Sequence, residues 1–94
     1  MKRKIEVRRL AELELNRAEE RRLGLGVEFL SDFKKSLAII AERPQSFPIE
    51  CRDFRKALLD RFPYRIFFRV SDEQIVIVGV LHGSQRISRL RGRS

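Results

Sequence analysis

The chain is poor in the residues that staple a fold or hold a metal. Its 94 residues include one cysteine, Cys51, one histidine, His82, and no tryptophan. A single cysteine cannot form an intramolecular disulfide, which excludes a small secreted domain held together by disulfides and favours a reducing compartment, the cytoplasm. One histidine and one cysteine are too few for a tetrahedral zinc site. We therefore expect no metal.

Long hydrophobic runs are also missing. The longest, Ile75 to Leu81, spans seven residues, far fewer than the ~20 that a membrane-spanning helix needs. The basic start at residues 1–4 resembles part of a signal peptide, but Glu6, Arg8 and Arg9 interrupt the apolar stretch that should follow. With 43% hydrophobic and 36% charged residues, the sequence indicates a soluble cytoplasmic domain without a membrane segment or an export signal.

Acidic residues are the scarcer charge. Lys and Arg number 21 against 13 Asp and Glu, a formal net charge of +8. Residues 1–50 hold eleven basic and nine acidic residues, net +2, whereas residues 51–94 hold ten and four, net +6. The second half is therefore the electropositive half. This balance favours an acidic partner, either nucleic acid or an acidic protein segment.

Two periodicities predict the fold. Good helix formers fill residues 10–22, and apolar residues recur every three or four positions over residues 27–43, so both segments are expected to be helices joined by a turn at the glycines of 23–26. Gly24 and Gly26 match only part of a dinucleotide fingerprint and join two helices, so we read them as a turn and expect no cofactor. Pro44 ends the second helix, and residues 45–51 are interpreted as a surface connection.

The rest of the sequence has strand spacing. Residues 64–70 alternate between apolar and basic, residues 74–82 are apolar on both faces, and residues 54–62 form a weaker candidate, with a short first strand at Ile5 and Val7. The prediction is an α+β domain over residues 1–83, a helix hairpin packed on a small antiparallel sheet in the order β-α-α-β-β-β. The arginine-rich residues 84–94 are expected to be a basic tail, mobile until a partner orders it.

Four sequence segments resemble the ParE/RelE superfamily of bacterial toxins, in particular its ParE-like branch. They are GLGVEFL at 24–30, the stretch from Pro44 to Pro48, FPYR at 62–65 and LHG at 81–83, and the resemblance extends over residues 11–86. It implies a toxin of a plasmid-stabilisation type of toxin-antitoxin operon, inhibited by a cognate antitoxin whose acidic C-terminal segment wraps it in a hetero-oligomer.

The sequence leaves three functions open. The first is a toxin that inhibits DNA gyrase by binding, and the second is a RelE-like ribosome-dependent mRNA endoribonuclease. The third is a non-toxic descendant that only binds its antitoxin or nucleic acid. RelE-like ribonucleases carry a catalytic tyrosine or similar group near the C-terminus, whereas no tyrosine follows Tyr64 here. That difference, together with the lack of an evident acid/base pair, favours the first function.

Candidate site residues follow from charge and strand position. For target binding we expect Arg65 and Arg69, which alternate onto one sheet face, with Arg86 and Arg89 from the tail. In the nuclease interpretation, Arg65 and Arg86 would clamp phosphates and His82 or Tyr64 would transfer a proton. Structural roles are the competing interpretation for all of them. The residues expected to contact the antitoxin are Phe29, Phe33, Arg55 and Phe67.

Overall fold

The structure is a computed structural model that describes residues 3–21 and 26–94. Its elements are β1 (Lys4–Val7), α1 (Arg9–Arg21), α2 (Gly26–Glu42), the 3-10 turn η1 (Pro44–Ser46), β2 (Ile49–Cys51), β3 (Phe54–Leu58), β4 (Tyr64–Val70), β5 (Gln74–His82) and the 3-10 turn η2 (Ile87–Leu90). Both predicted helices and the predicted β4–β5 hairpin are confirmed. The predicted turn between the helices lies, apart from Gly26, outside the described residues.

The sheet is mixed, which corrects the expectation of an antiparallel sheet. Its strand order is β1-β5-β4-β3-β2, and β3, β4 and β5 are antiparallel neighbours. The first strand, however, runs parallel to β5, with Ile5 opposite Ile75 and Val7 opposite Ile77. Alternation along a sequence identifies a strand but not the direction of its neighbour, and a parallel pair needs a long crossover, here provided by all the intervening elements.

Residues 45–51 are more than the surface connection that the sequence indicates. They contain most of η1 and all of β2, which pairs irregularly with β3 at the edge of the sheet. The Pro48 carbonyl accepts a hydrogen bond from the Lys56 amide. Three residues are too few to display a strand period, so this short strand leaves no alternation signal in the sequence.

The sheet has an apolar layer on each face. On the first, residues of both helices pack against the sheet in one buried cluster, which includes Ala11, Ala18, Phe29, Phe33, Ile40, Ile66, Phe68, Ile75 and Ile77. On the second lie Phe54, Phe67, Val76, Val78, Leu81 and Leu90. This second cluster explains why β5 is apolar on both faces: β5 lies between β1 and β4, and each of its faces is covered.

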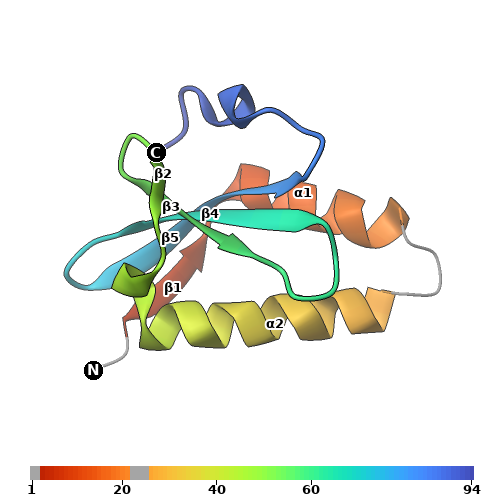
Figure 1. Cartoon of the computed structure of the whole chain (residues 1–94), viewed down its shortest axis with the longest axis horizontal. Helices are drawn as coiled ribbons and strands as arrows, with labels where there is room; N and C mark the ends of the chain where they lie inside the picture. The colour runs from red at the N-terminus through yellow and green to blue at the C-terminus, as the bar shows by residue number, and fades with distance from the viewer. Residues whose placement is uncertain (1–2, 22–25) are drawn as a thin grey trace.

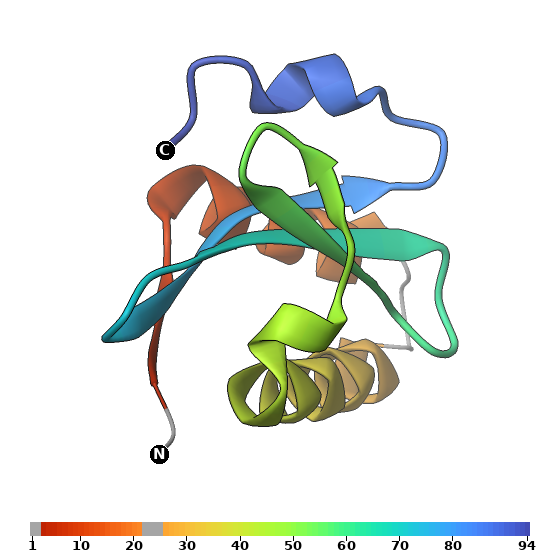
Figure 2. The same ribbon diagram turned by 60° about the vertical axis from the view of Figure 1, so that its left-hand side comes forward.

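Residues 84–94, which we call the C-terminal strap, cover the second face. Figures 1 and 2 show the strap on the side of the sheet opposite α2. Its Leu90 is 1% exposed, and Ile87 packs against the same cluster. The tail was expected to be mobile, but it is folded onto the sheet, because its two apolar residues, spaced three apart, complete the second buried cluster. The arginines that surround these two residues in the sequence make the segment resemble a basic tail.

Candidate functional site

Arg65 and Arg69 lie on a covered face of the sheet. The two side chains share the β4 face of Phe67, which is fully buried in the second cluster. Both residues are half-buried, since the C-terminal strap lies over this face. The alternation suggests an open cationic sheet face. The structure instead has a covered apolar layer on this face, with the two arginines at its margins.

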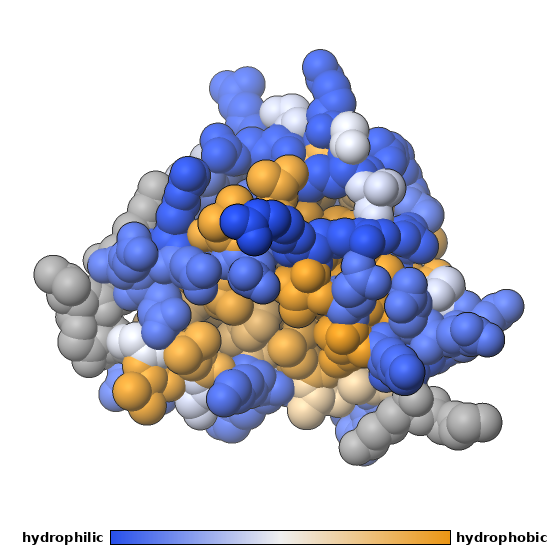
Figure 3. Space-filling view, turned by 180° about the vertical axis from the view of Figure 1, so that it is seen from behind, coloured by the Kyte–Doolittle hydropathy of each residue, from blue (hydrophilic) through white to orange (hydrophobic). Residues whose placement is uncertain are grey.

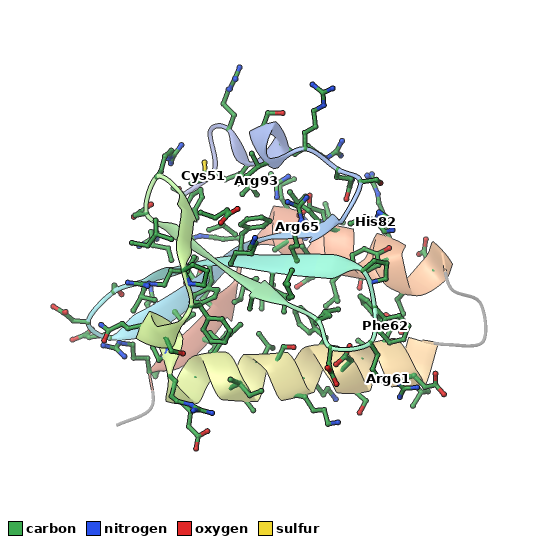
Figure 4. The ribbon with its side chains drawn as sticks, in the orientation of Figure 1. Cys51, Arg61, Phe62, Arg65, His82 and Arg93 are labelled. Carbon is green, nitrogen blue, oxygen red and sulfur yellow. The ribbon has the colours of Figure 1, made fainter. Side chains whose placement is uncertain are left out.

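Arg65 holds the turn that follows β5. Its Nη2 donates hydrogen bonds to the carbonyl oxygens of His82, at 3.2 Å, and of Gln85. Its guanidinium carbon lies 5.4 Å from the centre of the Phe67 ring, and its buried Nε has no hydrogen-bond partner in the part of the chain that the structure describes. Figure 4 shows the side chain between β4 and the strap. Because this guanidinium already donates to two backbone carbonyls, the role of Arg65 is structural.

The end of the chain is held by further basic side chains. Arg69 Nη2 donates to the Ser94 carbonyl at 3.3 Å, and Arg52 Nη2 donates to the Arg93 carbonyl at 3.0 Å. Arg93 itself reaches α1 beside β5: it donates to the Val78 carbonyl and makes a two-pronged ion pair with Glu14 at 2.8 and 2.9 Å. These contacts fix the strap at its far end.

Exposed arginines remain on the outside of the strap. Arg86, Arg89 and Arg91 are exposed, and no ion pair involves them among residues 3–21 and 26–94. The electropositive second half of the sequence is thus displayed by the strap rather than by the sheet itself. Of the four predicted target-binding residues, Arg86 and Arg89 are free to contact a partner, whereas Arg65 and Arg69 are engaged beneath them.

His82 and Tyr64 are neighbours but lack the setting of a proton-transfer pair. Their rings meet edge to face, with centres 5.1 Å apart. His82 Nδ1 accepts a hydrogen bond from the Ser84 amide at 3.0 Å and lies 2.8 Å from the Ser84 hydroxyl. Neither an ion pair nor a carboxylate hydrogen bond involves His82 in the described parts of the chain. The ring therefore serves the turn after β5, while Tyr64 is 4% exposed and belongs to the core.

The residues expected to contact an antitoxin lie mostly inside the molecule. Phe29, Phe33 and Phe67 are 0%, 3% and 0% exposed, so they offer almost no surface to a partner. Arg55 is half-buried and its Nη1 donates to the Phe47 carbonyl at 2.6 Å, which ties β3 to the segment before β2. Helical and strand periodicity identifies the apolar side of an element. In this protein that side packs into the core, so it is not available to a partner.

The comparisons with known proteins identify the family. Residues 5–87 match the family described as "ParE toxin of type II toxin-antitoxin system, parDE". The chain belongs to this ParE toxin family. A solved structure, "Chromosomal ParDE TA system from P. aeruginosa", is similar with a TM-score of 0.71 and 19% identity, over 85% of this chain and 95% of that chain. This likeness shows that the two share a fold. No curated protein is significantly similar in sequence.

This ParE-family toxin of a type II toxin-antitoxin system has two structural features near the strap that the sequence did not indicate. The Glu14–Arg93 pair joins residues 79 positions apart, and Arg52, the one non-glycine residue with positive φ among those described, sits at the β2–β3 turn. No local motif marks such long-range pairs. Glu14 is one of four glutamates in this helix, and nothing in the local sequence distinguishes it from the other three.

Two negative findings complete the site. Within residues 3–21 and 26–94, no group of three or more His, Cys, Asp or Glu side chains is placed to hold a metal ion. No helix in the same described ranges is both long and apolar enough to cross a membrane.

Proposed function

We propose that this ParE-family toxin acts by binding a target protein through the exposed arginines of the C-terminal strap, and that DNA gyrase is the target. The observation that supports binding rather than bond-breaking is that two of the four catalytic candidates are engaged in the fold: Arg65 donates to two backbone carbonyls, and His82 accepts the Ser84 amide. The strap displays Arg86, Arg89 and Arg91 on its outer surface. The choice of gyrase rests on the ParE-like resemblance of residues 62–65 and 81–83.

The antitoxin is the second partner. A toxin of a type II system is paired with an antitoxin, and the similar structure is a ParDE system. The net charge of +8 favours an acidic one. We propose that it covers the apolar surface left by the helices and the sheet edge, about 1,600 Å² or more in total. Among the residues that the structure describes, the large apolar side chains that are exposed are Leu10, Leu13, Val27, Ile39, Ile49 and Leu58.

Figure 3 displays apolar surface gathered in the middle of the back face, bordered by hydrophilic side chains. At the sheet edge, Ile39 of α2 and Leu58 of β3 line an open groove of about 670 Å³ together with Lys35. Leu58 is 66% exposed and lies beyond the residues that pair with β2. An extended partner segment with apolar side chains fits this edge, since the unpaired edge of a strand can pair with a further strand. Besides Lys35, the groove is lined by Asp32 and Asp60, so its charges do not select acidic side chains.

The test is a supercoiling assay with purified chain and gyrase. We expect micromolar chain to inhibit supercoiling, and addition of the antitoxin to restore it. Unchanged supercoiling at that concentration would show that gyrase is not the target. Growth that is unaffected by expression of the chain without its antitoxin would favour the non-toxic descendant that only binds.

The RelE-like endoribonuclease is a second candidate, and one observation favours it. Tyr64 and His82 are in ring contact, and Tyr64 lines a pocket that also contains Arg17 and Arg89. Codon-specific mRNA cuts in a translation extract that disappear in His82→Ala and Arg86→Ala would establish the nuclease and displace gyrase inhibition. Intact mRNA in that extract supports the binding mechanism.

A further inference from the structure

A small polar pocket lies where α1, β4, β5 and the C-terminal strap meet. Its volume is about 150 Å³, below the ~300–1,000 Å³ of ordinary small-molecule sites. The walls come from Tyr64 at the start of β4, Val80 on β5, Arg17 and Ala18 on α1, and Arg89 on the strap. Four elements that are distant in sequence thus form one recess, which exists only while the strap is folded onto the sheet.

The Tyr64 hydroxyl is the unusual feature of this pocket. Tyr64 is 4% exposed, and its ring is held edge to face by Phe29 and His82 at centre distances of 5.2 and 5.1 Å. Among the described residues, however, no hydrogen bond involves its hydroxyl, and the hydroxyl is not one of the fully enclosed polar atoms. Buried tyrosine hydroxyls normally have a partner. Tyr64 lines the recess, so an acceptor bound there is within reach of this residue.

The charges around the recess are those of an anion site. Arg17 and Arg89 are exposed, and neither has an ion pair in residues 3–21 and 26–94. The one carboxylate of the pocket, Glu14, is already occupied, because it is paired with Arg93 and accepts the Val80 amide at 3.0 Å. Among the described residues, two guanidinium groups without an ion pair and one hydroxyl without a hydrogen bond therefore line a recess whose one carboxylate is already paired.

We infer that this pocket binds the carboxylate of one acidic side chain of the antitoxin, with Tyr64, Arg17 and Arg89 as its donors. The inference rests on the proposed antitoxin partner. A carboxylate matches the planar fork of guanidinium, and the volume suits a side chain rather than a nucleotide. The apolar walls of Ala18 and Val80 suit the methylene stem of a glutamate. Because Arg89 also belongs to the strap surface that faces the target, an antitoxin seated here blocks target binding directly.

The chain provides its own reporter for a test with a defined probe. Tyr64 is the single tyrosine and there is no tryptophan, so intrinsic fluorescence reports this site alone. N-acetylglutamate α-amide, whose only charge is the side-chain carboxylate, should change the signal saturably with half-saturation on the order of 1–10 mM. The neutral N-acetylglutamine α-amide should not. Arg17→Gln and Arg89→Gln should each raise the half-saturation concentration about tenfold, while Arg43→Gln, an exposed arginine of the α2 end, should leave it unchanged.

Three results would overturn the inference: no saturable change with the glutamate probe, a change that both pocket variants leave intact, or saturation by inorganic phosphate in place of the glutamate probe. The last result would assign the pocket to a phosphate, as nucleic acid carries. Tyr64→Phe removes the reporter itself, so it is examined by circular dichroism, and it should stay folded because no hydrogen bond of the Tyr64 hydroxyl is found among the described residues.

Binding of the antitoxin itself is measured by calorimetry with the full chain. The Arg17→Gln/Arg89→Gln double variant should bind at least about tenfold more weakly than the Arg43→Gln control. Equal affinities of the two variants would reject the pocket as an antitoxin contact. If the unaltered chain binds no antitoxin at all, the proposed partner fails. The glutamate titration does not depend on the antitoxin, so the two failures are distinguishable.

Discussion

At the scale of single residues, most charged side chains expected to act on a target are instead used to hold the fold. Arg65 is fastened to the backbone after β5 and Arg55 to the backbone before β2. Charge and strand alternation placed Arg65 and Arg69 on one face, which the structure bears out, but neither signal shows what covers that face. Alternation is a local property, whereas cover depends on contacts between distant segments.

Arg65→Ala should destabilise the protein by about 1–3 kcal/mol, because it leaves the carbonyl oxygens of His82 and Gln85 without their donor. Urea unfolding measures the change. Arg86→Ala is the matched control, since Arg86 is exposed and surface substitutions usually stay within about 0.5 kcal/mol. Equal midpoints for the two variants would mean that the Arg65 contacts contribute nothing.

The Glu14–Arg93 pair leads to a second prediction at this scale. Both side chains are almost buried, at 11% and 12% exposed. Arg93→Ala removes the cation and leaves a nearly buried carboxylate, which should cost about 3 kcal/mol. Arg91→Ala, on the exposed side of the strap, should melt at nearly the temperature of the unaltered chain. A similar melting temperature for Arg93→Ala would contradict the pairing.

At the scale of elements, the packing of the strap on the sheet is the part of the fold that could not be predicted from the sequence. The helices and the β4–β5 hairpin are long enough to display their periods, so they were predictable. The three-residue β2, the parallel direction of β1 and the docking of the strap were not, because each depends on a partner element that local pattern does not name. At Gly79 the strap lies directly against β5: an added Cβ would lie 2.5 Å from Leu90 Cδ2.

Gly79→Ala should therefore push Leu90 out of its site and cost about 1–3 kcal/mol. Leu90→Ala should cost about 2–5 kcal/mol, since it empties a buried position. In the double variant the smaller Leu90→Ala side chain relieves the clash, so the combined cost should be less than additive. Denaturant unfolding of the four proteins tests this. Strict additivity would show that the strap does not pack on Gly79.

At the scale of the whole molecule, a basic domain meets an acidic partner across a surface that also has apolar parts. Its antitoxin affinity should fall with salt, by about tenfold between 0.1 and 1 M, since exposed ion pairs are screened and apolar contacts are not. The calorimetric constant at several salt concentrations measures this. A steep, many-decade loss would be typical of phosphate contacts and would favour nucleic acid as the partner.

The most direct test measures affinity for immobilised gyrase. Three purified proteins are compared: the unaltered chain, the strap variant Arg86→Gln/Arg91→Gln, and His82→Asn. We predict that the unaltered chain and His82→Asn bind equally well, because an asparagine oxygen can still accept the Ser84 amide. The strap variant should bind at least about tenfold more weakly. Undetectable binding of the unaltered chain, or binding that is lost in His82→Asn and kept in the strap variant, would contradict a toxin that acts through its cationic strap.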